Sequence, residues 1–476
     1  MMNSNSNTCI TLSHFGINEG LESKTLYKKT DKNGYIVHYN KDELKLVDSE
    51  YVQLYSKCRS LIFNKDDQLI GFAPVKSQNN TSIDKNFVLS DINNLEIEEF
   101  VEGTMITLFY DKTGDLGSED LKNWCIATKT KIGGTNSFYN YGIASTKSFK
   151  EMFKETIQDI NLNLDSLDKD VCYSFVMQHM ENRVVSSYQF NDLVLVEAYK
   201  INMSSCQELY HIDFLDVFTL KESFADSKVR FPERFDKSNY ISEEKTLSFE
   251  KIKERFNSKM DVDNINLDIF TFVDTVPKGI IVKNKKTGQR FKYRNETYEF
   301  LAKLRGNQSK LEYHYLTLRK NNNMELFLRV FPEFEKQFLG FRDKVHNFTQ
   351  ALHYNYFKCF KEHSSKLNEI SFELRSHLYE IHKNYLENMR GTGKTVQFND
   401  IKNYVNELPE ARLMFSINYN TRPNEKRLSL KIPPNTNTNN GPNAPRSVEN
   451  STFTFSSEIP KYIASNVNDS ELLLYA

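Results

Sequence analysis

The sequence predicts an α+β protein in which an antiparallel-sheet domain is followed by an all-α domain. Residues 1–295 mix short apolar or alternating segments, such as SLIFN, MITLFY and LVLVEAYKI, with polar turns, which is typical of antiparallel strands. From residue 296 to about 420, apolar side chains recur every three or four positions, as on amphipathic helices. Residues 421–476 are poor in apolar residues and rich in Asn, Pro and Ser, so we expect a flexible tail there.

Composition excludes several classes of protein. No run approaches the roughly 20 apolar residues of a membrane span, and the first residues lack the features of a secretory signal, so we expect a cytoplasmic protein with no membrane partner. The six cysteines are far apart without a C-x-x-C pair, which favours neither a zinc site nor a disulfide framework. The formal net charge is −1, so any contact with nucleic acid requires a local basic face.

The helical region contains two clear stripes and one misleading motif. The stripes are Phe338, Phe341, Val345, Phe348, Leu352, Tyr356 and Phe360, and Ile370, Leu374, Leu378, Ile381, Tyr385 and Met389. The segment MRGTGKT (389–395) imitates the end of a phosphate-binding P-loop, but Asn388 stands where that motif requires glycine, and the segment follows a helix pattern instead of a buried strand. We therefore expect a helix end and a loop there, with Gly391 as the C-cap.

Two cations flank a pair of predicted strands in the first domain. Arg59 directly precedes the apolar segment SLIFN, and Lys76 follows a second strand and a proline turn in GFAPVKS. Cations at the ends of paired strands can hold phosphate oxygens. The alternative is that both are ordinary solvated charges.

Basic residues also alternate with other residues in two further segments. Lys129 and Lys131 are two apart in WCIATKTKIGG, and Arg290, Lys292 and Arg294 alternate in QRFKYRN. Because residues two apart on a strand point the same way, each segment predicts a basic strand face. The alternative is an exposed strand face that charge keeps soluble.

In this order, these stretches resemble the adenylyltransferase domain of the phage-type (family 1) RNA ligases, members of the covalent nucleotidyltransferase superfamily. YSKCRSLIFN resembles the upstream C-R-G/S strand, FAPVKS the phosphate-binding lysine segment, and FVEGTMI the nucleotidyl-lysine motif K-x-D-G. The later motifs of these ligases are similar, in order, to TKTKIGG, YSFVMQHMENRVVSSY, KGIIVKN and FKYRN. An all-α domain after the last motif also fits that family, and residues 294–320 further resemble uncharacterised ligase-like proteins of large DNA viruses.

The departures from the family pattern bear on catalysis. In the family a lysine attacks the α-phosphate of ATP, and here Phe100, which has no lone pair, stands at its position. Two family glutamates, one that supports the ribose and metal and one from the E-G-x-V motif, fall on Ser174 and Lys278. The positions that match the phosphate-contacting residues of the ligases keep their cations: Arg59, Lys76, Lys129 or Lys131, Lys292 and Arg294. The acid and the glycine of the lysine motif are also present, as Glu102 and Gly103.

Three hypotheses about function follow. In the first, the covalent step is lost, and the site binds nucleotide phosphates or RNA in RNA repair or processing, with ATP as the implied ligand. In the second, an active ligase uses a relocated nucleophile, Lys76 or Lys278, and then needs Mg²⁺. In the third, an inactive protein serves as a scaffold, in a virion or in an RNA-processing assembly.

The helical region offers one more basic segment. LRGNQSKLEYHYLTLRK places Arg305, Lys310 and Arg319 among tyrosines and a histidine, a mixture that suits phosphates and unstacked bases. We treat these three as candidate RNA-binding residues. The alternative is an interdomain surface with core tyrosines.

Overall fold

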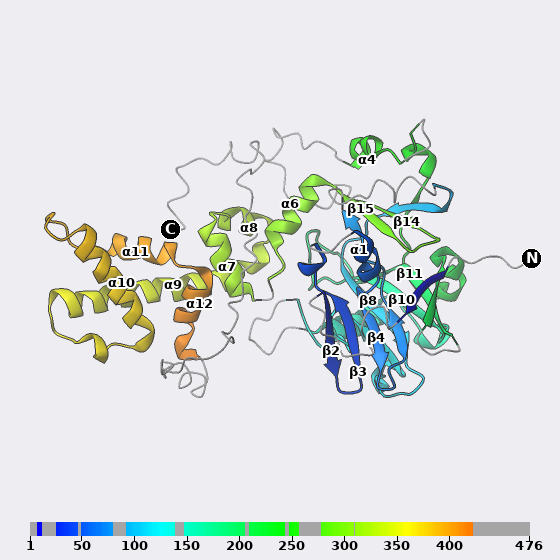
Figure 1. The fold of residues 1–476 in the computed structure, drawn as a ribbon, viewed down its shortest axis with the longest axis horizontal. Helices are drawn as coiled ribbons and strands as arrows, with labels where there is room; N and C mark the ends of the chain where they lie inside the picture. The colour runs from blue at the N-terminus through cyan, green and yellow to red at the C-terminus, as the bar shows by residue number, and fades with distance from the viewer. Residues whose placement is uncertain are drawn as a thin grey trace, which may run out of the picture. The chain divides into compact units, whose positions relative to one another are not determined.

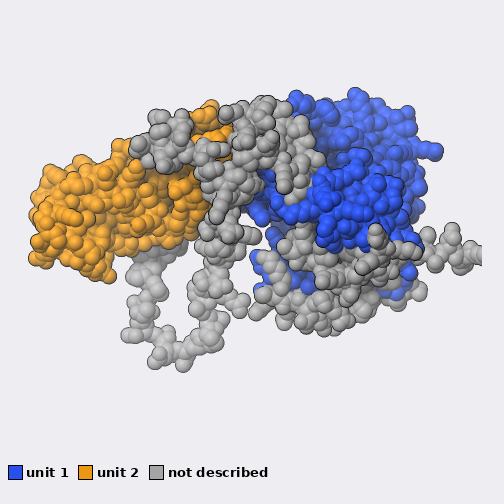
Figure 2. All heavy atoms as spheres, turned by 90° about the horizontal axis from the view of Figure 1, so that it is seen from above, with its two compact units in different colours: residues 1–259, 270–310 blue, residues 260–269, 311–476 orange. Residues whose placement is uncertain are grey.

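The computed structural model describes residues 7–11, 25–45, 49–79, 92–138, 147–204, 209–242, 247–256, 278–308 and 310–421. Two compact units form: unit 1 comprises residues 1–259 and 270–310, and unit 2 comprises residues 260–269 and 311–476 (Figures 1 and 2). The helix expected to open the all-α domain, α6 (Glu296–Arg305), is counted with unit 1. The tail expected over 421–476 lies outside the described residues from residue 422 onward.

Unit 1 contains three sheets whose strands pair antiparallel, apart from one short parallel pair, β15 with β6. Sheet A has the order β1 (Asn7–Thr11), β12 (Leu209–Leu215), β11 (Asp192–Met203), β10 (Val171–Gln178), β8 (Thr104–Tyr110), β9 (Trp124–Ala127). Sheet B has the order β2 (Leu26–Asp31), β3 (Gly34–Tyr39), β4 (Leu61–Asn64), β5 (Leu69–Phe72). Sheet C has the order β13 (Arg234–Phe235), β7 (Leu95–Glu99), β14 (Gly279–Asn284), β15 (Arg290–Arg294), β6 (Gln78–Asn79). The predicted α+β class is confirmed.

Short helices of unit 1 connect and cover these sheets. They are η2 (Glu43–Lys45), α1 (Ser49–Ser56), η3 (Ile92–Asn94), η4 (Glu119–Leu121), α3 (Phe149–Asp159), η5 (Leu164–Ser166), η6 (Val217–Phe224), η7 (Lys237–Tyr240), α4 (Phe249–Phe256) and α6. Helix α3 begins where the Ser148 hydroxyl accepts from the Glu151 amide and the Glu151 carboxylate accepts from the Ser148 amide, a reciprocal cap. Its Phe149 and Phe153 are buried in the core on one face of sheet A.

The two faces of sheets A and C are chemically different. One face of sheet A packs on α3 and η6, and the other packs partly on sheet B, where Phe109 and Tyr199 meet Phe63 and Phe72. In sheet C, Ile97 and Val282 are cross-strand partners in an apolar core with α4. Because side chains alternate along a strand, the opposite face of sheet C carries the intervening charged residues of β7, β14 and β15.

Unit 2 is helical within the residues that the structure describes. Its elements are α7 (Leu311–Lys320), α8 (Met324–Val330), η9 (Pro332–Phe334), α9 (Glu335–Tyr356), a π-helical turn η10 (Phe357–Lys361), η11 (Leu367–Glu369), α10 (Phe372–Asn388), α11 (Phe398–Glu407), α12 (Glu410–Ile417) and η12 (Tyr419–Thr421). The two predicted stripes supply the buried faces of α9 and α10. Helix α10 ends at Asn388, and its C-cap is Met389, so the expected C-cap at Gly391 is wrong. Turns with positive φ at Gly391 and Gly393 follow, which confirms the loop at MRGTGKT. Among the described helices, none combines the length and apolar character of a membrane span.

Candidate functional site

Four basic residues from all three sheets of unit 1 form what we call the cation cluster: Arg59, Lys76, Lys129 and Lys292. Arg59 lies just before β4, as predicted, and Lys76 follows β5 and its proline turn. Lys129 follows β9, and Lys292 lies on the charged face of β15. Arg59 and Lys76 act electrostatically on both Lys129 and Lys292. These four residues, far apart in the chain, therefore lie near one another in unit 1.

Burial and mutual repulsion both act on the lysines of the cation cluster. Burial, followed by Arg59, Lys41 and Lys76, lowers the pKa of Lys129 from 10.5 to about 8. Burial, followed by the neighbouring Arg294, lowers the pKa of Lys292 to about 8 as well, and Arg59 and Lys76 add to the effect. Both influences disfavour the charged form of an amine. The cluster is therefore a region of positive potential.

Carboxylates do not neutralise Lys129 and Lys292 within the described ranges. Glu299 favours the charged form of Lys292 but pairs with Arg294 instead. The Lys129 ammonium lies 3.9 Å from the centre of the Tyr39 ring, a cation–π contact that leaves its positive charge without a counterion. Partly buried cations without a carboxylate partner cost free energy, so an anionic ligand gains free energy by binding among them.

Sheet A contributes two buried hydroxyls that lack a partner. The hydroxyls of Ser174 and Tyr199 have no hydrogen-bond partner in the described part of the chain, and both side chains are buried. The Arg59 guanidinium acts electrostatically on Tyr199, which places this hydroxyl near the cation cluster. Ser174 pairs with Glu197 across β10 and β11, as Cys172 pairs with Tyr199, so both hydroxyls belong to the same face of sheet A. Both oxygens are enclosed by the folded chain.

Phe100, which matches the position of the nucleophilic lysine in the ligases that the sequence resembles, lies between β7 and β8. Its amide donates to the carbonyl of Gly279 (2.9 Å). Its ring meets the Tyr298 ring edge-on at 5.6 Å, and the Arg294 guanidinium carbon lies 5.8 Å from the ring centre. The side chain at this position therefore packs beside a cation of β15 and offers no nucleophile.

Glu102 and Gly103 have roles within the fold. The Glu102 carboxylate accepts from the amides of Val185 (2.7 Å) and Ser186 (2.9 Å), and from the hydroxyls of Ser186 (3.2 Å) and Tyr188 (3.1 Å). Gly103 has φ +146°, and a Cβ there would come within 2.5 Å of the Met177 carbonyl oxygen. The carboxylate anchors residues 185–188, and the glycine allows the chain to pass close to β10.

Lys278 lies away from the cation cluster. It precedes Gly279, and it is two residues from Ile280, whose cross-strand partner is Glu99. By alternation Lys278 shares the face of Ile280 and Glu99, opposite to that of Phe100, and its charge lowers the pKa of Glu99, which burial raises. The glutamate-to-lysine departure therefore adds no charge to the cluster.

The remaining basic candidates are engaged elsewhere. We expected Lys129 and Lys131 on one strand face, and this is wrong: β9 ends at Ala127 and the chain turns, with the Thr128 amide donating to the Lys131 carbonyl. Only Lys129 joins the cluster, since the Lys131 ammonium pairs with Asp31 at 2.6 Å. The glycines at 133 and 134, both with positive φ, close this turn.

The three RNA-binding candidates differ in their surroundings. Arg305 is buried in unit 1, where it donates to the Arg183 carbonyl (3.3 Å) and lies over the Phe138 ring. Lys310 is exposed before α7, and Arg319 donates to the Asn406 side chain within unit 2.

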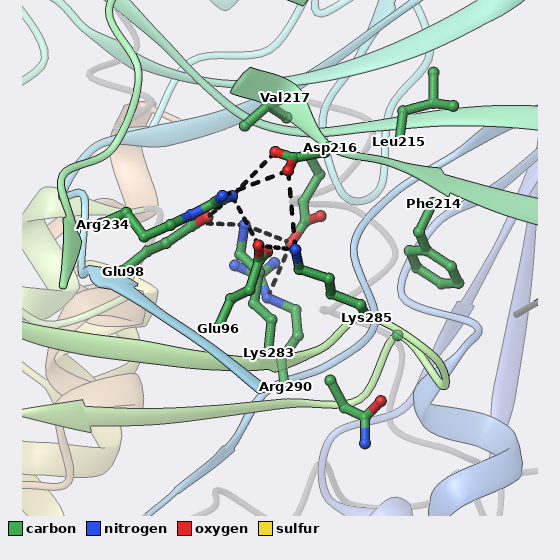
Figure 3. A pocket seen from close by; sticks show the side chains of 13 residues that line it. Glu96, Glu98, Phe214, Leu215, Asp216, Val217, Arg234, Lys283, Lys285 and Arg290 are labelled. Atoms are coloured by element: carbon green, nitrogen blue, oxygen red, sulfur yellow. Dashed lines mark hydrogen bonds and ion pairs between the residues drawn. The ribbon is translucent and has the colours of Figure 1, made fainter. Parts of the chain in front are cut away.

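A second charged region in unit 1, which we call the charge box, was not found from the sequence. Four carboxylates and four cations line a cavity of about 50 Å³ (Figure 3): Glu96, Glu98, Glu197, Asp216, Arg234, Lys283, Lys285 and Arg290. The Lys283 ammonium lies 2.5 Å from Glu98 and 3.2 Å from Glu197, and it donates to the Val196 carbonyl (2.8 Å). Arg234 reaches Asp216 at 3.0 Å and Glu98 at 3.3 Å. Opposite charges balance within the box, so it joins sheets A and C without requiring a ligand.

The described residues do not fit the Mg²⁺ that the ligase resemblance implies for an active enzyme. No group of three or more His, Cys, Asp or Glu side chains suited to a metal occurs among them. Ser174 stands where the family has a glutamate, and its cross-strand neighbour Glu197 is engaged by Lys283 and Arg290. We therefore derive no step through a metal.

Comparisons with known proteins give only distant likenesses. No family model matches the sequence, and no curated protein matches it. Among solved structures, the chain is similar to two forms of an archaeal ATP-dependent RNA ligase. For form 1, the TM-score is 0.34, the sequence identity is 10%, and the match covers 85% of this chain and 76% of that chain. For form 2, the TM-score is 0.29, the identity is 11%, and the match covers 88% of this chain and 77% of that chain. It is also similar to a Naegleria gruberi RNA ligase, a lysine-to-alanine mutant with ATP and Mn, with a TM-score of 0.27 and 10% identity over 63% of this chain and 98% of that one.

Proposed function

We propose that unit 1 is a degenerate, RNA-ligase-like nucleotidyltransferase domain that binds the phosphates of a nucleotide or of RNA without forming a covalent intermediate. The cation cluster carries this proposal, because Arg59, Lys129 and Lys292 are gathered without a neutralising carboxylate in the described ranges. Phosphate oxygens supply the missing negative charge through charge-assisted hydrogen bonds. ATP is the ligand that the motif order suggests.

Loss of the covalent step follows from Phe100. A benzyl side chain cannot attack phosphorus, and Ser174 and Lys278 replace the two acidic positions that the resemblance links to the ribose and the metal. The phosphate-contacting cations persist although the nucleophile does not. This combination is expected of a domain that retains binding and has lost self-adenylylation.

The test is ATP binding by the full chain, measured by isothermal titration calorimetry, together with intact-protein mass spectrometry after incubation with ATP and Mg²⁺ or Mn²⁺. We expect saturable binding and no mass increase of one AMP. Absence of binding would refute the site, whereas an AMP adduct would refute the loss of chemistry.

One observation favours a second candidate, self-nucleotidylation at another lysine. Lys129 and Lys292, with pKa values lowered to about 8, are partly neutral amines near physiological pH, which is the state that a nucleophilic lysine requires. Peptide mapping of any AMP adduct would identify the lysine. An adduct at Lys292 or Lys129 would establish this candidate, and one at Lys76 or Lys278 would establish the relocation expected from sequence.

RNA binding and protein scaffolding are separated by their salt dependence. If about four phosphates of a single strand are contacted, RNA affinity should fall about fiftyfold between roughly 50 and 200 mM salt. An apolar protein interface would be nearly insensitive to the same change. Fluorescence anisotropy with a labelled single-stranded RNA and the full chain measures this slope, and a flat slope would argue for the scaffold.

A further inference from the structure

Helix α10 of unit 2 carries an exposed apolar stripe formed by Phe372, Tyr379 and Leu386. These side chains are 38%, 63% and 44% exposed. They are seven residues apart, so they lie along one face of the helix over about 21 Å. Ser376 and Lys383, which lie between them on this face, are also exposed.

The stripe is distinct from the face that holds α10 in unit 2. Leu374, Leu378 and Ile381 are buried and supply the packing face, and His377 is buried beside them. Large apolar side chains gathered in a row on a helix already packed on its other side indicate an interaction surface.

The chain leaves the described structure at the start of this stripe. The Tyr419 ring lies 5.5 Å from the Phe372 ring, and the Asn420 side-chain amide donates to the Glu373 carboxylate (2.9 Å). Thr421, the last described residue, therefore lies at the beginning of α10. Residues 422–476 continue from there, and their sequence is polar over 434–451 but contains the apolar run LLLY at 472–475.

We propose that residues 471–475 (ELLLY) dock on the α10 stripe of the same chain. Since each residue of a chain can span up to roughly 3.3 Å, residues 422–470 are long enough to bring the segment to any point of the stripe. Tethering gives the segment an effective concentration in the millimolar range, so even a weak apolar contact is populated. The expected partner of the stripe is thus the chain's own apolar run at 472–475.

Charge also favours this occupant. Asp469 and Glu471 adjoin the apolar run. Arg390 and Lys394 are exposed just beyond the end of α10, and Lys383, within the stripe, is exposed with Glu387 at 3.8 Å. Opposite charges beside a small apolar contact add specificity to it.

The proposal is tested by photo-cross-linking in the full chain. Tyr379→p-benzoylphenylalanine places a photoreactive group on the stripe, and mass spectrometry of the digested monomer identifies its target. We expect an intramolecular cross-link to residues 471–475. A cross-linked dimer on a denaturing gel would assign the stripe to a second copy and overturn the proposal, as would a monomer without this cross-link.

A matched pair of tail variants controls the result. In the Tyr379→p-benzoylphenylalanine background, L473D with L474D should lower the cross-link yield about tenfold, because two buried leucines become charged. F453D with F455D, which changes two apolar residues elsewhere in the same segment, should leave the yield within about twofold of its starting value. Equal losses in both variants would contradict docking by residues 471–475. Placement of the probe at Phe190, a 65% exposed residue of unit 1, gives the background yield.

Discussion

The charge box and the cation cluster adjoin in unit 1, but their cations differ in whether they have carboxylate partners. In the box, each buried cation has a carboxylate partner, as Lys283 has Glu98 and Glu197. In the cluster, Lys129 and Lys292 lie among other cations, and burial together with those cations lowers their pKa values. Arg290 belongs to the box and also lowers the pKa of Arg59, after the larger effect of burial, so the two regions adjoin.

The contrast separates charged side chains that stabilise the fold from those that bind a ligand in our proposal. Paired buried ions hold the fold, and removing one partner is expensive. Cations left unpaired reduce stability, so their presence requires another explanation, and ligand binding supplies it. Substitutions in the two regions should therefore change stability in opposite directions.

The largest expected effect is from Lys283→Met in the charge box. It removes the cation nearest to the buried carboxylates of Glu98 and Glu197, which keep only the longer contacts to Arg234 (3.3 Å) and Arg290 (3.5 Å). The free energy of unfolding of unit 1 should fall by about 3–5 kcal/mol. The single tryptophan, Trp124, is buried on β9 of unit 1, so its fluorescence in urea reports this transition. Lys285→Met is the control: its side chain is 48% exposed, and its loss should cost under about 1 kcal/mol. Equal costs would remove the distinction between buried and exposed pairs.

Lys292→Met in the cation cluster should weaken ATP binding without lowering the stability of unit 1. ATP affinity should fall about tenfold to a hundredfold, because one charge-assisted contact is lost, while the free energy of unfolding stays unchanged or rises. Calorimetry and urea unfolding measure the two quantities. Lys131→Met, which removes a cation paired with Asp31, should change affinity by less than about twofold. If Lys292→Met destabilised the unit as Lys283→Met does, Lys292 would be a structural cation.

The pH dependence sharpens the contrast further. The pKa values of Lys129 and Lys292 are lowered to about 8, so ATP affinity should be constant below pH 8 and fall by up to about tenfold per lysine for each pH unit above it. The phosphate charge of the ligand is constant in this window because its last pKa is near 6 or just above. The unfolded chain binds more protons than the folded one between pH 8 and the usual lysine pKa, so the contribution of these lysines to stability rises there. An affinity that holds steady to pH 10 would contradict the lowered pKa values.

The smallest expected effect concerns single hydroxyls. Ser174→Ala removes a buried hydroxyl that lacks a partner in the described part of the chain, so the free energy of unfolding should stay constant or rise by up to about 1 kcal/mol. Ser186→Ala removes a hydroxyl that donates to Glu102 and should lower the free energy of unfolding by about 1 kcal/mol. A loss of stability in Ser174→Ala would show that its hydroxyl is paired in solution.

Strand and helix patterns predicted the cations near strands correctly in most cases. Arg59 and Lys76 flank β4 and β5, where apolar runs and a proline turn define the strand ends. Alternation placed Lys292 on a basic face of β15. The same rule was wrong at Lys131, because the chain turns after Ala127 and the twin glycines close that turn.

The charge box shows why the rest could not be predicted. Its partners come from β7, β11, β13, β14 and β15, and the sequence gives no rule for which carboxylate meets which cation across two sheets. Alternating acids in LEIEE predict a charged strand face. This pattern does not tell whether the carboxylates of that face meet solvent or a buried cation. Sheet packing decides between them.

The sequence by itself determined the α+β class, the helical stripes, the absence of an amine at Phe100 and the identity of the cations that remain, because these follow from residue type and local periodicity. Only the tertiary structure decided that Glu102 anchors residues 185–188, that Lys278 lies beside Glu99, and that Lys283 has carboxylate partners while Lys292 lies among cations. The free energy of a charge depends on its burial and on its neighbours, and both are set by segments that meet only when the chain folds.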